Sequence, residues 1–313
     1  MLNRRHIRIK ILQTFYAYFQ SDNKDMIKGE KELSHSMQRI YDLYLYLLQL
    51  FISLKRHANI QKEESKRSRY IQGVDLSHSN SFSDHQLISF LENSAGFVKI
   101  CKDRKISWEG DLENDLAKKL FRSINCSEVY NEILETDIDD FSKHKILLIR
   151  LFKDEICNFS LLQHYFEEKS IYWQDDLDHV ASMVIKTLKN INIDGKVNVM
   201  KLWKDDEEDF AKTLFRKAIL QKQENDIVLE KYSKNWESDR LAKMDTYLMN
   251  LAMTEVKEFS SIPIKVTLNE YIEISKFYST PKSNGFINGL LDKIFYDFKK
   301  EGLLKKSGRG LME

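Results

Sequence analysis

The amino-acid sequence predicts an all-α protein, and three observations lead to that prediction. Only 2 prolines and 10 glycines occur among 313 residues, so the residues that interrupt long helices are scarce. Hydrophobic residues make up 42% of the chain and charged residues 31%, which suits a buried core with a charged exterior. Apolar residues recur at three- and four-residue spacing over long stretches, the pattern of one helical face.

The first predicted helix covers residues 4–20, where Ile7, Ile11 and Phe15 lie on one face. A second apolar stripe runs from Ile40 to Phe51. Residues 61–86 are rich in Ser, His, Asp, Lys and Arg, which predicts a solvated polar connector. Five more helices are expected around residues 86–102, 112–123, 127–136, 141–168 and 174–190.

Four further helices are expected toward the C-terminus, one of which carries apolar Leu248, Leu251, Ala252 and Val256 on one face. The acidic run at residues 205–209 precedes an apolar stripe and is typical of a helix start, because carboxylates favour the positive end of the helix dipole. Thr267 and Glu270 have the spacing of a capping box, which predicts a helix that begins at about Leu268. The last helix carries an apolar face from Phe286 to Phe298.

The bulk charge and the cysteines exclude several classes of protein. A formal net charge of +1 argues against a uniformly basic nucleic-acid binder but not against a local basic patch. Cys101, Cys126 and Cys157 form neither a disulfide framework nor a zinc motif, which favours a reducing cytoplasm. No signal peptide or membrane span is expected. The usual nucleotide-binding and hydrolase motifs are missing, so we expect a non-enzyme without cofactor or metal.

The first helix carries a cluster of cations. Arg4, Arg5, Arg8 and Lys10 lie in its opening turns, and residues 1–20 contain no acidic residue. Each cation near a helix N-terminus costs about 0.3–1 kcal/mol against the dipole, so folding alone does not favour this arrangement. Arginine forks suit phosphates and stack on bases, which predicts an exposed RNA-binding edge that includes the nearby Tyr16. The alternative is an ordinary solvated or salt-bridged helix end.

Two blocks of sequence carry a resemblance to a known family. The first block is RRHIR at residues 4–8 with QTFY at 13–16. The second comprises NWESDRL at 235–241, IPIKVTLNE at 262–270 and GFINGLLDK at 285–293, in that order. Together they resemble the NusB family of bacterial antitermination factors, which bind a boxA RNA element together with the ribosomal protein NusE. His6 stands where this family often has another arginine.

The resemblance implies roles for individual residues. Basic and aromatic side chains would lie on or near the RNA face, namely Arg4, Arg5, Arg8, Tyr16, Tyr278 and Phe286. Asn288 would hold the local turn, with helix capping as the alternative, and Asp245 would approach NusE. Phe286 also begins an apolar stripe, so core packing is an equal alternative for it.

The resemblance covers roughly residues 1–55 and 206–298 and implies a NusB-like helical bundle of two subdomains, enlarged by central helices. The expected segments are a basic N-terminal segment at 1–60, the connector at 61–86, a helical insertion at 87–204, a NusB-like subdomain at 205–300 and a basic tail at 301–313. The implied function is antitermination on boxA-like single-stranded RNA of ribosomal RNA leaders, with NusE and the transcription elongation complex as partners. Two alternatives remain: a scaffold that works through the insertion, and an RNA-targeting module of an rRNA methyltransferase system.

Overall fold

A computed structural model describes residues 3–22, 25–72, 82–203, 206–233 and 242–311 of the chain. These residues form helices and no strand, which confirms the predicted all-α class. The α-helices are α1 (Arg4–Gln20), α2 (Met26–Gln72), α3 (Gln86–Glu92), α4 (Ala95–Asp103), α5 (Asp111–Ile124), α6 (Glu128–Glu135), α7 (Phe141–Leu151), α8 (Ser160–Lys169), α9 (Leu177–Asn190), α10 (Glu207–Ser233), α11 (Lys243–Glu258), α12 (Ile264–Tyr278) and α13 (Ser283–Lys300). Shorter turns of helix are η1 (Phe82–Asp84), η2 (Phe152–Ile156), η3 (Ile171–Trp173) and η5 (Gly308–Leu311).

The chain divides into two compact units. Unit 1 contains residues 1–37 and 202–313, and unit 2 contains residues 38–201. The long helix α2 contributes its first turns to unit 1 and the rest to unit 2. The two sequence segments of unit 1 therefore meet in space although most of the chain separates them.

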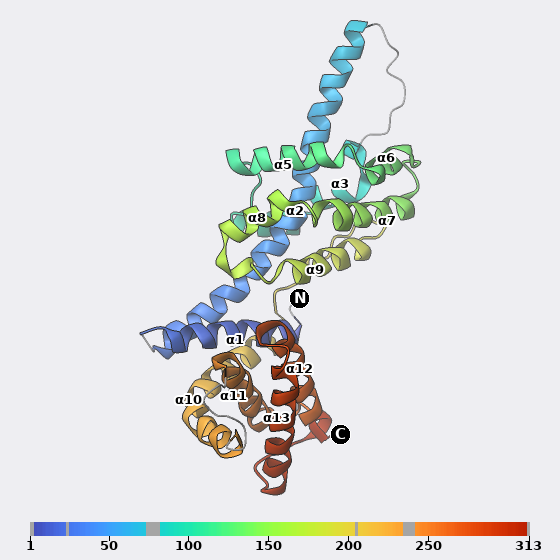
Figure 1. The fold of residues 1–313 in the computed structure, drawn as a ribbon. Helices are drawn as coiled ribbons and strands as arrows, with labels where there is room; N and C mark the ends of the chain where they lie inside the picture. The colour runs from blue at the N-terminus through green and yellow to red at the C-terminus, as the bar shows by residue number, and fades with distance from the viewer. Residues whose placement is uncertain (1–2, 23–24, 73–81, 204–205, 234–241, 312–313) are drawn as a thin grey trace. The chain divides into compact units, whose positions relative to one another are not determined.

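Unit 1 is built around α11, which is buried along most of its length (Figure 1). Helices α1, α10, α12 and α13 all pack against it. The buried residues of α1 include Ile7, Ile11 and Phe15, as the periodicity predicted. The start of α2 also approaches α10 closely in unit 1. A Cβ atom on Gly29 of α2 would lie 2.9 Å from the Phe215 ring of α10.

Unit 2 has the middle of α2 as its core, and α3 to α9 pack around it (Figure 1). Two tryptophans fix loops to this helix through their indole groups. Trp108 Nε1 donates to the Tyr46 carbonyl at 2.8 Å, and Trp173 Nε1 donates to the Arg39 carbonyl at 2.6 Å. The Tyr44 hydroxyl hydrogen-bonds Thr187 of α9 at 2.7 Å, so α2 organises the helices of this unit.

Several boundaries differ from the sequence expectation. Helix α2 continues through residues 61–72, where the sequence indicated a connector. The stretch 86–102 divides at Asn93 into α3 and α4, and 141–168 divides into α7, η2 and α8. Helix α12 begins at Ile264 rather than Leu268, because Pro263 fits the helix start and Thr267 lies inside the helix.

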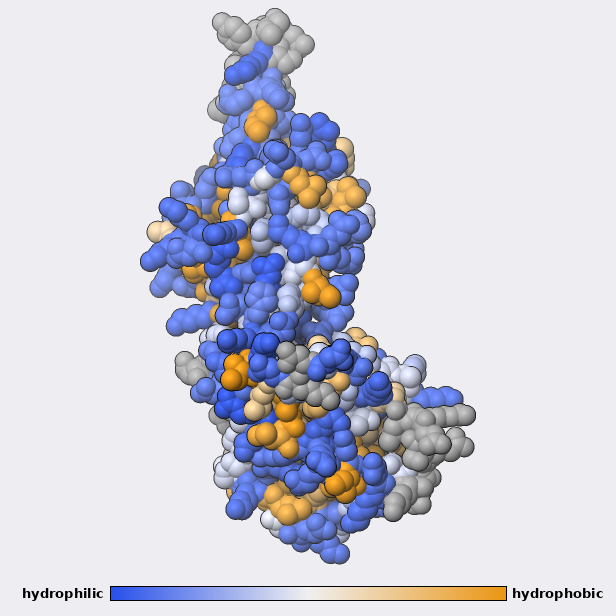
Figure 2. All heavy atoms as spheres, turned by 90° about the vertical axis from the view of Figure 1, so that its left-hand side faces the viewer, coloured by the Kyte–Doolittle hydropathy of each residue, from blue (hydrophilic) through white to orange (hydrophobic). Residues whose placement is uncertain are grey.

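The surface is mostly hydrophilic on the face drawn in Figure 2, where hydrophobic residues form separate patches. Among the described helices, none is both long enough and apolar enough to cross a bilayer.

Candidate nucleic-acid interface

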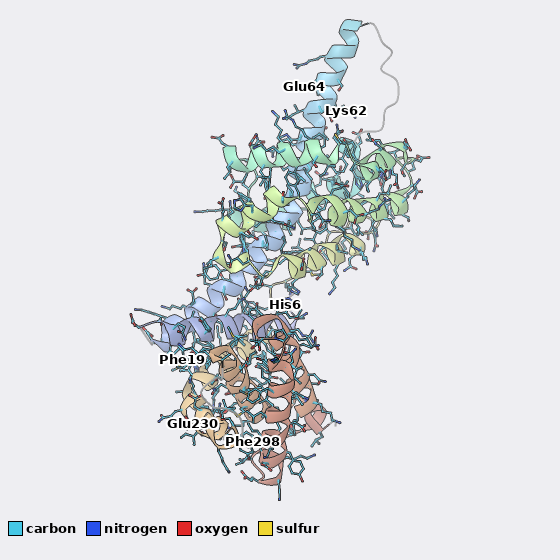
Figure 3. All side chains as sticks on the ribbon, viewed as in Figure 1. His6, Phe19, Lys62, Glu64, Glu230 and Phe298 are labelled. Carbon is cyan, nitrogen blue, oxygen red and sulfur yellow. The ribbon has the colours of Figure 1, made fainter. Side chains whose placement is uncertain are left out.

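The N-terminal turn of α1 is fixed by a local cap. The Asn3 side chain accepts a hydrogen bond from the His6 backbone nitrogen at 2.9 Å and contacts His6 Nδ1 at 2.8 Å. Burial, with the charges of Lys10 and Arg5, lowers the pKa of His6 to about 4. His6 is therefore neutral near neutral pH and adds no charge to the basic helix. His6 and Phe19 mark the opposite ends of α1 in Figure 3.

Arg8 forms a buried ion pair with Glu255 of α11. Arg8 Nε and Nη2 donate to the two carboxylate oxygens at 2.7 and 2.6 Å, and both side chains are almost fully buried. The same carboxylate accepts from the Thr267 hydroxyl at 2.8 Å and from Tyr271 at 3.2 Å. We call these four residues the Arg8 cluster. It joins α1, α11 and α12 through hydrogen bonds to a single carboxylate.

The electrostatics of the Arg8 cluster favour the charged form of Arg8. Burial alone would lower the pKa of Arg8, but the charge and hydrogen bonds of Glu255 outweigh it, and the pKa is raised. Burial and the neighbouring Glu255 raise the pKa of Tyr271 well above its usual value. Tyr271 therefore remains a neutral donor.

The expectation that Arg8 and Lys10 lie on an exposed edge is wrong. Their exposed fractions are 2% and 1%. The hydrophobic stripe of α1 continues under its cationic turns because α11 and α12 cover that side of the helix. For Arg8, the salt-bridged alternative holds.

Arg4 and Arg5 remain at the surface. Arg5 Nε and Nη2 each donate to Glu270 of α12 at 2.9 Å, yet the Arg5 side chain is 40% exposed. That hydrogen bond raises the pKa of Arg5 against a smaller effect of burial. Arg4 pairs with Asp206, is 35% exposed, and its guanidinium carbon lies 4.5 Å from the Phe210 ring centroid. These two arginines carry the exposed positive charge of the α1 start.

A groove of about 1020 Å³ opens beside these arginines. We call it the arginine groove, and its lining residues are Asn3, Arg4, Arg5, Arg8, Asp206, Ser261, Ile262, Pro263, Val266 and Glu270. All of them belong to unit 1. The groove combines arginine forks with the exposed apolar side chain of Val266, a composition that suits a strand of phosphates and bases.

Helices α1 and α12 run parallel in a fixed register. Arg5 contacts Glu270, and two turns later Gln13 Nε2 donates to the Tyr278 hydroxyl at 3.0 Å, each pair being 265 residues apart. Eight helical residues span about 12 Å, so the edge extends that far from the arginines to Tyr278. Tyr278 is half-buried there.

Phe277 is an aromatic residue on α12 that sequence reasoning missed. Its exposed fraction is 80%, the largest among the large hydrophobic residues of the described ranges. Tyr271, Ile274 and Ser275 define the buried face of α12, and a helical wheel places Phe277 away from it. The angular offset of Phe277 from this face on the helical wheel could have predicted its exposure from the sequence.

The other expected site residues lie near the same helices. Tyr16 is 39% exposed, and its ring meets Tyr247 edge-on at 5.9 Å. Phe286 is half-buried on α13. Asn288 is exposed within α13 and does not hold the turn. The turn is held instead by Asn284, which accepts from Ser275 at 2.6 Å, and by the Thr280–Ser283 hydroxyl pair at 2.8 Å.

Asp245 is buried rather than presented to a partner. Its exposed fraction is 4%, and its carboxylate accepts a hydrogen bond from Ser279. This contact joins the first turn of α11 to the residue that follows α12. Direct contact of Asp245 with another protein is incompatible with this burial.

The chain is similar to known proteins over part of its length. The model of the NusB family matches residues 171–295. The transcription antitermination protein NusB of Salinibacter ruber is 37% identical over 144 residues, which cover 46% of this chain and 85% of that protein. The protein of the same name from Chloroherpeton thalassium is 42% identical over 106 residues, 34% of this chain and 50% of that protein. No solved structure matches the chain significantly.

A third relative, the transcription antitermination protein NusB of Natranaerobius thermophilus, is 37% identical over 91 residues, 29% of this chain and 66% of that protein. The matches to the second and third relatives thus span about half and about two thirds of those proteins. The family match includes the resembling segments at 262–270 and 285–293 but not the arginine-rich first helix. The segment 235–241 lies outside the described residues.

Proposed function

The chain belongs to the NusB family, and we propose that it acts without catalysis as a transcription antitermination factor that binds boxA-like single-stranded RNA through unit 1. The observation that carries the proposal is the pair of partly exposed arginines, Arg4 and Arg5, at the arginine groove. Residues 205–300 are the NusB-like part in this proposal.

The ion pairs of these arginines are compatible with RNA binding. Exposed ion pairs contribute only about 0–1 kcal/mol to stability. Asp206 and Glu270 therefore orient the two guanidinium groups, but an RNA phosphate can replace either carboxylate at little cost in free energy. An RNA phosphate that replaces either carboxylate also releases condensed counterions, which favours binding. Arg8 does not take part directly but fixes the helix that carries Arg4 and Arg5.

Aromatic residues would contact the bases further along the edge. Tyr16 and Phe277 are exposed, and Tyr278 and Phe286 are partly so. Exposed rings accept bases of any sequence by stacking, so they suit a single strand rather than a duplex. Asn288, exposed on α13, is available to hydrogen-bond a base edge.

We infer the protein partner from the family. NusE would bind unit 1 together with the RNA, as part of the transcription elongation complex on ribosomal RNA leaders. Asp245 supports that surface from beneath by holding Ser279. Adding purified NusE is expected to increase the RNA affinity of the full chain.

The test replaces the two exposed arginines in the full chain. Arg4→Ala/Arg5→Ala is expected to weaken binding of a labelled boxA-like RNA at least about tenfold and to lower the slope of log affinity against log salt by about 2. Arg216→Ala/Lys217→Ala is the matched control, because these cations on α10 are also exposed and paired with carboxylates. Equal affinity of wild type and the Arg4/Arg5 variant, with circular dichroism unchanged, would refute the proposal.

A further inference from the structure

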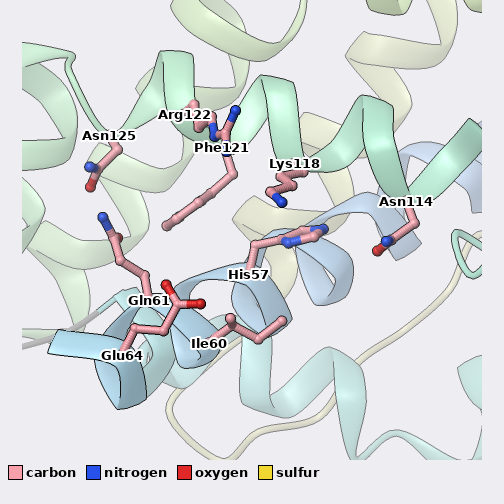
Figure 4. Close-up of a pocket in the computed structure, with 9 residues that line it drawn as sticks. All are labelled: His57, Ile60, Gln61, Glu64, Asn114, Lys118, Phe121, Arg122 and Asn125. Atoms are coloured by element: carbon pink, nitrogen blue, oxygen red, sulfur yellow. The ribbon is translucent and has the colours of Figure 1, made fainter. Parts of the chain in front are cut away.

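A polar groove in unit 2 lies between α2 and α5 and shares no lining residue with the arginine groove. Its volume is about 380 Å³. We call it the α2–α5 groove; its lining includes Gln61 and Glu64 from α2 and Asn114, Lys118, Arg122 and Asn125 from α5 or directly after it (Figure 4). His57, Ile60 and Phe121 complete the lining. Every one of these residues belongs to unit 2.

Two cations lie one helical turn apart on the wall of the groove. Lys118 and Arg122 are exposed, and within the described ranges neither has a carboxylate at ion-pair distance. Their neighbour Lys119, by contrast, pairs with Asp115 at 2.8 Å. The helix dipole favours a cation in the last turn, which accounts for Arg122. It does not account for two cations that share a groove with amide side chains.

The groove also offers hydrogen-bonding groups beside an apolar surface. Figure 4 shows the amide ends of Gln61 and Asn125 toward one end of the groove and His57 with Lys118 toward the other, with Phe121 between them. His57 is 7% exposed, its ring stacks on Phe121 at 6.5 Å, and its buried Nε2 has no hydrogen-bond partner within the described part of the chain. Ile60, exposed by 48%, provides the apolar surface.

We propose that the α2–α5 groove binds a nucleotide, with its phosphate on Lys118 and Arg122 and its base over Ile60, facing Gln61 and Asn125. A phosphate can form ion pairs with Lys118 and Arg122. The edge of a base carries hydrogen-bond donors and acceptors that match the side-chain amides of Gln61 and Asn125. The groove has the size of a small-molecule site.

Glu64 distinguishes this ligand from other anions. Its carboxylate can accept a hydrogen bond from the amino or ring N–H group of a base, a donor that inorganic phosphate does not place beside its charge. The nucleotide can be free or can be one unit of single-stranded RNA, because both present the same phosphate and base. The inference goes beyond RNA binding by unit 1 and does not depend on it.

The experiment measures binding to the full chain by calorimetry with four probes: a ribonucleoside monophosphate, a short single-stranded RNA, inorganic phosphate and an acidic peptide. Lys118→Ala/Arg122→Ala removes the two cations and is expected to weaken binding of the monophosphate or the RNA at least about tenfold. The matched control is Lys99→Ala/Lys102→Ala, which removes two exposed cations from α4 of the same unit. Both variants alter only exposed side chains, and thermal unfolding checks their folding.

The RNA arm is repeated in the Arg4→Ala/Arg5→Ala background, so that failure in unit 1 and failure in unit 2 are separate results. If Lys118→Ala/Arg122→Ala weakens binding of the monophosphate, the ligand is a free nucleotide. If the variant weakens binding of the RNA but not of the monophosphate, the ligand is one unit of an RNA. The proposal is overturned if Lys118→Ala/Arg122→Ala binds both as wild type does. It is also overturned if the groove variant loses only the acidic peptide or inorganic phosphate.

Discussion

Arg8 and Glu255 form a two-pronged ion pair inside unit 1, with donor–acceptor distances of 2.7 and 2.6 Å. The geometry of this pair explains why an arginine of a basic helix points inward. Glu255 would otherwise be a buried carboxylate without a cation, and Arg8 a buried guanidinium without an anion. Each makes the burial of the other possible, and α1 is held on α11 as a result.

Loss of one partner of this pair is expected to destabilise unit 1 strongly. Arg8→Met leaves Glu255 buried without its cation, and such a change typically costs about 3–5 kcal/mol. Urea unfolding of the full chain measures the change. Arg5→Met is the control, since its ion pair is partly exposed and contributes about 0–1 kcal/mol. If Arg8→Met lowered the free energy of unfolding no more than Arg5→Met does, the structural role given to Arg8 would be contradicted.

A side chain at Gly29 is expected to destabilise the protein. The Cβ of Gly29→Ala would lie 2.9 Å from Phe215 and 3.1 Å from Tyr18, and overpacking of this kind costs about 1–3 kcal/mol. Gly289→Ala in α13 meets nothing within 4 Å and should stabilise the helix by about 0.5–1 kcal/mol. The two unfolding free energies should therefore change in opposite directions. A stabilising Gly29→Ala would show that α2 does not approach α10 so closely.

His85 is expected to make unit 2 sensitive to acid. Burial, with the neighbouring His144 and Lys55, lowers its pKa from 6.5 to about 3. The unfolded chain then binds more protons between these values, so the free energy of unfolding falls as the pH falls from about 6.5 toward about 3. His85→Leu should flatten this dependence, measured by urea unfolding at several pH values. Equal slopes for wild type and His85→Leu would exclude His85 as the cause.

Phe277 is expected to contribute to RNA affinity and not to stability. Its ring is 80% exposed, so Phe277→Ala should leave the unfolding midpoint within experimental error of wild type. Loss of one base-stacking ring should weaken RNA binding by about 1–3 kcal/mol. Tyr296→Ala on α13 is the control, because Tyr296 is 68% exposed. Equal RNA affinities for the two variants would remove Phe277 from the interface.

Helical periodicity predicted α1 with its observed bounds and the acidic start of α10, because both depend on residues close together in sequence. The start of α12 could not be found that way. Thr267 and Glu270 have capping-box spacing, but their side chains bind Glu255 and Arg5. Pro263 sets the start of the helix. The side chains of Thr267 and Glu270, which the local pattern assigned to a helix cap, form tertiary hydrogen bonds instead.

The candidate site was predictable only in part for the same reason. The sequence indicated which residues of α1 are basic, but the covering of Arg8 and Lys10 depends on where other helices pack. The buried Asp245 likewise accepts a hydrogen bond from Ser279, which lies 34 residues away. The exposure of Phe277 was accessible from the helical wheel of α12, since its neighbours at 274 and 275 define the buried side.

The 265-residue separation between Arg5 and Glu270 has a consequence for synthesis of the protein. During translation, α1 leaves the ribosome long before its carboxylate partners on α11 and α12 exist. While the ribosome synthesises unit 2, the cations and the hydrophobic face of α1 therefore have none of the helices that later cover them. The nascent chain therefore acquires its finished basic edge only after α11 and α12 have been synthesised and have met α1.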